Sequence, residues 1–133
     1  MATELTAAMR EFLSEARIGV LAGIKEDGSP QLTPIWFLLE GDEILINTAR
    51  ERVKGRIFER EPRASFCVFE DFRYLTLSGR VTISEDSDMA DIKRIGLRYK
   101  PMEFLEKRIR DQWGRQQRIT LHLKIEHVVS SGF

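Results

Sequence analysis

Apolar residues recur at every second position through much of the chain, which is the spacing that places them on one face of a β-strand. The pattern is clearest over residues 73–84 and 117–129. Shorter apolar runs complete a set of six predicted strands, the other four lying at residues 17–24, 31–39, 43–48 and 64–69.

The last predicted strand separates its apolar from its polar side chains. Ile119, Leu121 and Leu123 fall at alternate positions and are predicted to face inward. Arg118 and Thr120 belong to the polar set between them, which is predicted to face outward.

Apolar residues spaced three or four apart predict amphipathic helices in the remaining parts of the chain. These helices are predicted at residues 3–16, 51–60, 86–99 and 102–113. Pro101 separates the last two, and Pro62 ends the second because the residue before a proline resists the helical conformation.

Three positions mark turns or irregularities in the predicted sheet. Asp27-Gly28 predicts a tight hairpin turn, because glycine readily adopts the positive φ that such turns need. Pro34 lies in the middle of the strand predicted at 31–39 and has no N–H to donate, so this strand lies at an edge or carries a bulge. Gly79 interrupts the strand at 73–84 and indicates a bulge or a close backbone approach.

The order of the elements predicts one domain over residues 1–133. The strands follow one another in hairpin succession, with one helix between the third and fourth and two before the last. Many short antiparallel strands usually close into a barrel. The predicted fold is therefore mainly β, a six-stranded antiparallel barrel with flanking helices.

Composition narrows the classes of function. Lys and Arg together number 21 and are balanced by 21 Asp and Glu, which argues against a general nucleic-acid or membrane-surface binder. No run is long enough to span a membrane and no secretory signal is recognised, so the cytoplasm is the expected compartment. One cysteine, Cys67, and two histidines exclude an internal disulfide and argue against a metal site.

Basic residues crowd one corner of this neutral chain. Arg50, Arg52, Lys54 and Arg56 follow the polar pair Asn47-Thr48 at the start of a predicted helix. A helix N-terminus already carries partial positive charge, so cations gathered there repel one another unless an anion lies among them. Phosphate is the usual ligand of an anion site of this kind. The alternative is a solvated helix face whose long side chains cover apolar surface.

Six segments resemble the pyridoxamine-phosphate-oxidase-like split barrels and together extend over most of the chain. They are RIGVLA (17–22), DGSPQLTPIWF (27–37), NTARERVKGR (47–56), EPRAS (61–65), FRYL (72–75) and SGRV (78–81). The third and fourth resemble the branch of probable deazaflavin (coenzyme F420)-dependent reductases. The resemblance implies a split β-barrel homodimer with two flavin or deazaflavin sites at the subunit interface.

The resemblance also implies which residues bind the cofactor. Arg52 and Lys54 are implied to bind the cofactor phosphate, with further contacts from Asn47, Thr48 and Arg50.

The ring of the cofactor and the second subunit are assigned in the same way. The residues implied to line the isoalloxazine or deazaflavin ring are Thr33, Pro34, Ile35 and Trp36. Arg73 and Tyr74 are implied to reach the cofactor from the other subunit.

The activity implied is that of an oxidoreductase that moves a hydride between coenzyme F420 and a small unsaturated organic substrate. No side chain is assigned a catalytic role, because the cofactor carries the chemistry. An FMN-dependent flavin reductase on the same fold is one alternative, and a non-enzymatic flavin- or heme-binding protein is another. Residues 130–133 lack the Arg-x-Leu-Pro ending of true pyridoxamine-phosphate oxidases, so oxidation of a B6 vitamer is not expected.

Overall fold

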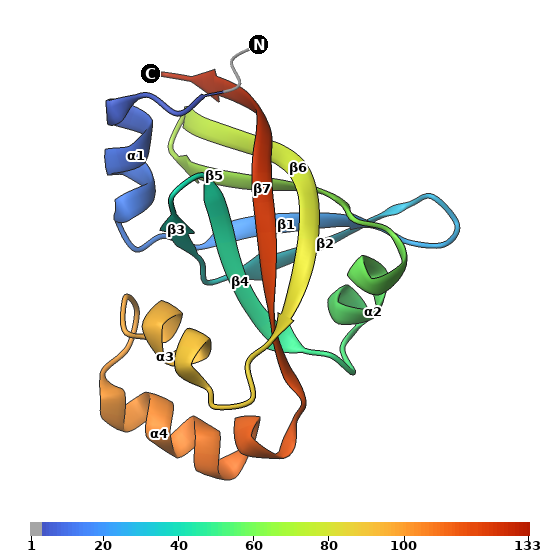
Figure 1. Cartoon of the computed structure of the whole chain (residues 1–133). Helices are drawn as coiled ribbons and strands as arrows, with labels where there is room; N and C mark the ends of the chain where they lie inside the picture. Colours follow the sequence, from blue (N-terminus) through green and yellow to red (C-terminus); the bar gives the residue numbers. More distant parts are fainter. Residues whose placement is uncertain (1–3) are drawn as a thin grey trace.

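A computed structural model describes residues 4–133 as a curled antiparallel sheet with helices packed around it (Figure 1). The strands are β1 (Gly19–Ile24), β2 (Pro30–Ile35), β3 (Leu38–Glu40), β4 (Glu43–Ala49), β5 (Arg63–Glu70), β6 (Arg73–Glu85) and β7 (Arg118–Ser131). The helices are α1 (Ala7–Ser14), α2 (Val53–Arg60), α3 (Ala90–Gly96), α4 (Met102–Asp111) and the short 3₁₀ helix η1 (Trp113–Arg115). Thr3, where the first helix was predicted to begin, lies outside the described residues.

The strand order shows why the sheet is curled. The order is β2-β1-β5-β6-β7-β4-β3, so β2 and β3 are the two edges of the sheet. Only Trp36 and Phe37 separate these strands along the chain. Three Cα–Cα steps join Ile35 to Leu38 and span at most about 11 Å. The two edges therefore lie close together, and the sheet forms a barrel that is split along this seam.

The prediction of six strands was wrong by one. The single strand predicted at 31–39 is two strands, because its first part pairs with β1 and its second part pairs with β4. Pro34 lies in β2, which has β1 as its only neighbour. The register between β1 and β2 is continuous, so the structure confirms an edge strand rather than a bulge at this proline.

The other predicted irregularities are confirmed. Gly28 has a φ of 86° in the turn between β1 and β2. The register of β6 against β7 shifts at Ser78/Gly79, which marks a bulge. A Cβ at Gly79 would lie 1.7 Å from the Lys124 carbonyl oxygen, so only glycine allows the two backbones to approach this closely.

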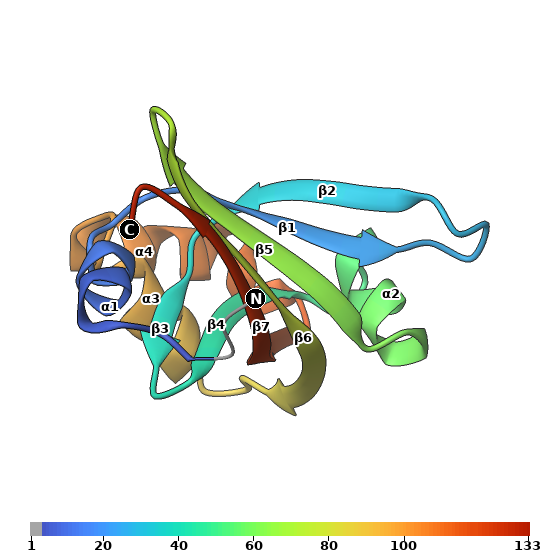
Figure 2. The ribbon, with the colours of Figure 1, turned by 90° about the horizontal axis from the view of Figure 1, so that it is seen from above.

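Two apolar clusters hold the helices in place. The larger fills the barrel and includes Phe12 and Leu13 of α1, which packs at one end of the sheet (Figure 2). The smaller joins α3, α4 and η1 through Ile92, Leu105 and Trp113. Among residues 4–133, no helix is both long and apolar enough to cross a membrane.

The helices α3 and α4 also cover part of the sheet that the sequence pattern assigned to the outside. Arg118 and Thr120 were predicted to face outward, yet they are 7% and 0% exposed. They lie on the face opposite Ile119 and Leu121, as the alternation predicts. That face is closed by α3, which contacts β4 beside them.

Candidate functional site

A cavity of about 380 Å³ lies between the β1–β2 edge of the sheet, the end of β4 and the helices α3 and α4. We call it the Trp36 cavity. The residues that line it are Ile18, Pro34, Ile35, Trp36, Asn47, Ile92, Ile95, Arg108, Trp113 and Arg118. Its lining is mainly apolar and aromatic, with two arginines and one amide as the polar groups, which is the usual composition of a small-molecule site.

Aromatic rings form one wall of the Trp36 cavity. The Trp36 ring stacks on Tyr99 with centroids 5.1 Å apart and meets Trp113 edge-on at 6.5 Å. The Tyr99 hydroxyl donates to the Arg17 carbonyl at 2.7 Å and accepts from the Phe37 N–H at 3.2 Å. Because these bonds fix Tyr99 between α3 and the β1–β2 edge, the Trp36 ring has a rigid backing.

One cation, Arg118, lines the other side of the cavity, and two more, Arg52 and Lys54, lie at the start of α2. The two groups are close in the fold, because Arg118 pairs with Ala49 of β4, whose carbonyl oxygen accepts the Arg52 N–H at 3.1 Å. Burial is the main cause that lowers the pKa of the Lys54 ammonium, and the nearby charges of Arg52 and Arg118 lower it further. Burial likewise lowers the pKa of Arg118 to about 10, with Arg52 as the next contributor, opposed by Asp86 and Glu51. Like charges that lower one another's pKa beside a cavity mark a candidate functional site, and a bound anion would relieve their repulsion.

Arg118 is the most constrained of these cations. Its Nε donates to Asn47 Oδ1 at 3.0 Å and its Nη1 donates to Gln116 Oε1 at 2.6 Å. The guanidinium carbon also lies 5.6 Å from the centroid of the Trp113 ring. The side chain is therefore held in one position at the cavity wall.

Asn47 links Arg118 to a buried carboxylate. Its Nδ2 donates to Asp86 Oδ2 at 2.9 Å and to Thr120 Oγ1 at 3.2 Å. Asp86 also accepts the backbone N–H groups of Asp91 and Ile92 at 2.9 and 3.0 Å, which caps the start of α3. Every side-chain polar atom of Asn47 is thus engaged within the chain.

The structure brings several of the predicted ligand residues together. Pro34, Ile35, Trp36 and Asn47 all line the Trp36 cavity. Arg52 is the N-cap residue of α2. Among the described residues, no side chain forms a capping hydrogen bond at this helix start. Lys54 lies in the first turn of the same helix, and the charge of Arg118 is one of the causes that lower the pKa of its ammonium.

Other predicted residues are engaged elsewhere within this chain. Arg50 forms ion pairs with Glu59 at 2.9 Å and with Glu85 at 2.5 Å, although its Nε is buried without a hydrogen-bond partner. Thr48 is buried on the strand face opposite Asn47, so the two side chains do not form one polar corner. Thr33 is half-buried in β2 and is not part of the cavity lining.

Arg73 and Tyr74 lie at the start of β6, and neither lines the Trp36 cavity. The Arg73 guanidinium lies 4.9 Å from the Phe12 ring centroid and 4.4 Å from that of Phe133. Their predicted role concerns the cofactor of a second subunit, so it stays a prediction.

Sequence reasoning did not assign six residues of the cavity to the site, although it considered Trp113 as a possible cap of a ring pocket and favoured core packing for it. The six are Ile18, Ile92, Ile95, Arg108, Trp113 and Arg118. All are far in sequence from the basic corner. For Trp113 the isolated position of a large aromatic residue between polar residues was a usable signal. For Arg118 the alternation of β7 pointed the wrong way, because it equates the polar face with solvent.

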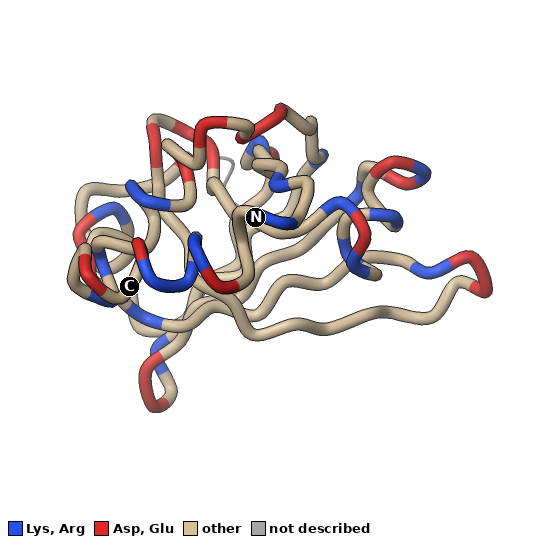
Figure 3. Tube along the Cα trace, turned by 90° about the horizontal axis from the view of Figure 1, so that it is seen from below, with Lys and Arg blue, Asp and Glu red and all other residues tan. Residues whose placement is uncertain are grey.

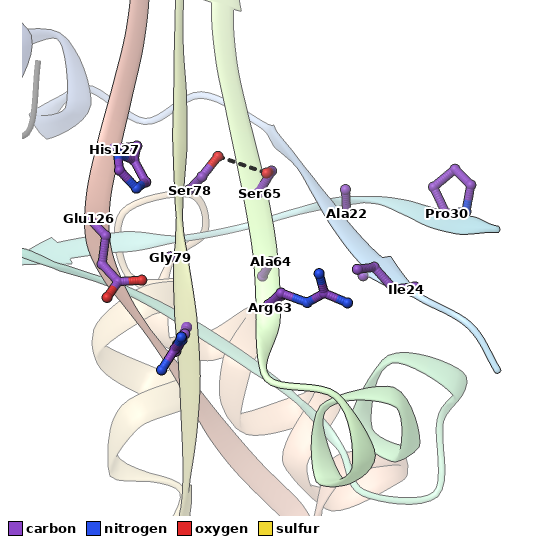
Figure 4. A pocket seen from close by; sticks show the side chains of 12 residues that line it. Ala22, Ile24, Pro30, Arg63, Ala64, Ser65, Ser78, Gly79, Glu126 and His127 are labelled. Atoms are coloured by element: carbon purple, nitrogen blue, oxygen red, sulfur yellow. Dashed lines mark hydrogen bonds between the residues drawn. The ribbon is translucent and has the colours of Figure 1, made fainter. Parts of the chain in front are cut away.

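A second hollow, of about 390 Å³, opens on the uncovered face of the sheet formed by β1, β5, β6 and β7 (Figure 4). We call it the outer hollow. Ser65 and Ser78 share a hydrogen bond of 2.8 Å at its floor, and Arg63 and His127 stand at its sides. None of the predicted ligand residues lines it. Among residues 4–133, no group of three or more His, Cys, Asp or Glu side chains is placed to hold a metal ion.

The curled antiparallel sheet with its seam defines a split-barrel protein, and the Trp36 cavity is its candidate small-molecule site. The family model of pyridoxamine 5'-phosphate oxidase matches residues 5–129. The chain therefore belongs to the pyridoxamine 5'-phosphate oxidase family.

Solved structures share the fold at low sequence identity. An F420 reductase matches with a TM-score of 0.80 and 21% identity, over 94% of this chain and 98% of that one. A conserved hypothetical protein from Mycobacterium tuberculosis matches with a TM-score of 0.75 and 26% identity, over 96% and 85% of the two chains. HutZ, the heme storage protein from Vibrio cholerae, matches with a TM-score of 0.72 and 21% identity, over 100% and 97%.

Proposed function

We propose that this protein is an oxidoreductase that uses coenzyme F420 to transfer a hydride to or from a small unsaturated organic substrate. The observation that carries the proposal is an aromatic cavity lined by Arg118, with the cations Arg52 and Lys54 at the start of α2, the helix that follows β4. The likeness of the fold to an F420 reductase supports the choice of cofactor.

The residues present fit such a cofactor. The ring stack of Trp36 on Tyr99 offers a flat apolar wall to a tricyclic ring, which gains from offset stacking. Lys54 and Arg118 are partly buried and can form charge-assisted hydrogen bonds with a phosphate. These bonds would offset the repulsion between the two cations. The Nε of Arg50, which is buried without a partner, is a further donor near this end of β4.

A bound deazaflavin would supply the hydride chemistry itself. The chain would supply binding at the cations and orientation of the ring by Pro34, Ile35 and Trp36. Ile92, Ile95 and Trp113 would exclude water from the inner side of the cavity, which strengthens electrostatic interactions within it. Reduction of an unsaturated bond would also require a proton, which a bound water would supply, so no side chain is assigned an acid or base role.

The homodimer is part of the same proposal. On the uncovered face, the register aligns Pro34, Val20, Cys67, Thr76 and Val129 in one uncharged row across β2, β1, β5, β6 and β7. Charged residues gather on the helices and turns, whereas the long strands are mostly uncharged (Figure 3).

Further apolar side chains extend this uncharged row on the same face, and three of them are strongly exposed. Ile18 is 47%, Leu32 60% and Phe69 53% exposed. A second copy would bury them, since an exposed apolar patch of this kind marks an interface. Ile18 and Pro34 belong both to this face and to the Trp36 cavity, so the second copy would border the cofactor.

FMN on the same site is the first alternative. FMN also carries a phosphate and a planar tricyclic ring, so the cations and the aromatic wall serve it equally. The protein would then be a flavin reductase.

Heme binding is the second alternative, and the outer hollow is the observation that favours it. His127, Arg63 and Arg80 all line this hollow, so one side chain able to act as an axial ligand and two cations for the propionates share it. The other histidine, His122, is bound to Ser84 at 2.8 Å and to Glu43 at 3.3 Å.

The test is a titration of the purified, cofactor-stripped protein with F420, FMN and hemin in parallel. Ligand fluorescence follows the first two, the Soret band follows hemin, and melting temperature serves all three. We expect micromolar binding of F420 and weaker binding of the others. Preference for FMN moves the protein to the flavin reductases, and a Soret shift lost in His127→Ala moves it to the heme binders. Binding of none refutes the proposed function.

A further inference from the structure

Arg118 has the properties of a ligand-binding arginine that the sequence pattern concealed. It is 7% exposed, it lines the Trp36 cavity, and its Nη2 forms no hydrogen bond among the described residues. A guanidinium with two donor positions fixed and a third facing a cavity is preorganised to bind an oxyanion.

No carboxylate forms an ion pair with Arg118 within 4.0 Å among residues 4–133. Its two side-chain partners are the neutral amides of Asn47 and Gln116. Asp86 lies beyond Asn47 in this network, because its Oδ2 accepts from Asn47 rather than from Arg118. The charge of Arg118 is therefore oriented by the chain but is not neutralised by a direct contact.

We propose that Arg118 is the third cation of a phosphate site with Arg52 and Lys54, and that Asn47 and Asp86 are positioning residues that hold it there. This changes the role expected for Asn47. Its amide donates to Asp86 and Thr120 while its oxygen accepts from Arg118, so it has no donor left for a phosphate.

The same contacts join the phosphate site to the helices of the cavity wall. Asp86 accepts from Asn47 and from the N–H groups of Asp91 and Ile92 at the start of α3. Thr120 Oγ1 donates to Asp91 Oδ2 at 2.6 Å. One buried carboxylate thus fixes both the arginine that meets the anion and the helix that lines the ring pocket.

The inference rests on the proposed function for the identity of the ligand, but not for the existence of an anion site. Its test therefore uses ligands simpler than F420. Inorganic phosphate reports the anion site alone. FMN and riboflavin share the ring and differ by the phosphate, so the ratio of their affinities isolates the phosphate contribution.

The central variant is Arg118→Gln, and Arg115→Gln is the matched control because Arg115 is an exposed arginine of η1. In the wild type, phosphate should raise the melting temperature more than sodium chloride at equal ionic strength. Arg118→Gln should abolish this difference and weaken FMN binding about tenfold to a hundredfold, with less than about a twofold change for riboflavin. Arg115→Gln should behave as the wild type.

Two further variants cover the case in which Arg118→Gln fails to fold. Arg118→Lys keeps the charge but loses the fork geometry, so its FMN-to-riboflavin ratio should fall between those of the wild type and Arg118→Gln. Asp86→Asn should lower the same ratio, whereas a purely structural role would weaken FMN and riboflavin equally.

The outcomes separate this inference from the proposed function. If FMN and F420 do not bind but phosphate still acts through Arg118, the anion site stands and the proposed cofactor falls. If flavin binds and Arg118→Gln or Arg118→Lys leaves the ratio unchanged, the inference falls alone. If phosphate has no specific effect and neither FMN nor F420 binds, both fall.

Discussion

Removal of the Lys54 charge should have opposite effects on stability and on ligand binding. Lys54→Met keeps the length of the side chain and removes the ammonium, which is partly buried and repelled by Arg52 and Arg118. The variant without ligand should therefore melt at the same temperature as the wild type or higher. One charge-assisted bond contributes about 1.5–3 kcal/mol, so affinity for F420 or FMN should fall about tenfold to a hundredfold.

The pH dependence of stability gives this prediction a second readout. The folded protein lowers the pKa of Lys54 from its ordinary value of 10.5, so the charged form is favoured in the unfolded chain. At neutral pH Lys54 is protonated in both the folded and the unfolded protein, so its charge destabilises the wild type fully. The wild type gains stability as the pH rises from the pKa of Lys54 in the folded protein toward its ordinary value. The advantage of Lys54→Met over the wild type should shrink across that window.

Thermal melts from pH 7 upward, with flavin titrations at pH 7, measure both effects. Lys107→Met is the control, because Lys107 is exposed on α4 and should show neither change. A Lys54→Met variant that loses stability without ligand, or that binds the cofactor as the wild type does, would refute the reasoning.

Three further predictions follow from individual contacts. Gly55→Ala places a Cβ 2.8 Å from the Ala49 carbonyl oxygen, so it should lower stability by about 1–3 kcal/mol and weaken flavin binding; an unchanged melting temperature would contradict this. Trp36→Leu removes the ring that stacks on Tyr99 at 5.1 Å, so flavin fluorescence should be quenched less on binding, and equal quenching would exclude ring contact at this wall. Leu32→Glu places a charge at a 60% exposed position on the uncovered face, so sedimentation should show a monomer where the wild type is a dimer, whereas a wild-type monomer would refute the interface.

Local patterns predicted the strands well because each strand carries its own period of two. The turn at Gly28 and the bulge at Gly79 were also readable, since each depends on the chemistry of one residue. The break between β2 and β3 was not, because Trp36 and Phe37 continue an apolar run. The chain leaves one edge of the sheet there for the other, and only the tertiary arrangement shows where that happens.

The candidate site was predictable to the extent that it is built from neighbouring residues. Pro34, Trp36 and Asn47 were found because they lie in segments that resemble the family. Arg50 illustrates the opposite case, because the carboxylates that engage it come from α2 and the end of β6. A run of basic residues does not show which of its members the fold will pair.

Arg118 shows why a correct strand pattern can still mislead about a site. Alternation placed it correctly on the face opposite Ile119, and the error lay in taking that face as solvent-exposed. Whether a polar face is solvated depends on what packs over it, and here α3 does so after Asp86 caps its start. A buried arginine on a nominally polar face is therefore found from the fold alone.

The pairing of charges, rather than their sum, is what distinguishes this site. The chain has as many acidic as basic residues, and several arginines far from the cavity have carboxylate partners, among them Arg94 with Glu40 at 2.6 Å. Asp86 is the only buried carboxylate among the described residues, and it is bound by N–H donors rather than by a cation. The fold thus leaves Lys54 and Arg118 close together with their charges unneutralised by direct contacts. Positive charge beside an aromatic cavity is the arrangement on which the proposed function rests, because an aromatic phosphate would use both parts of the site at once.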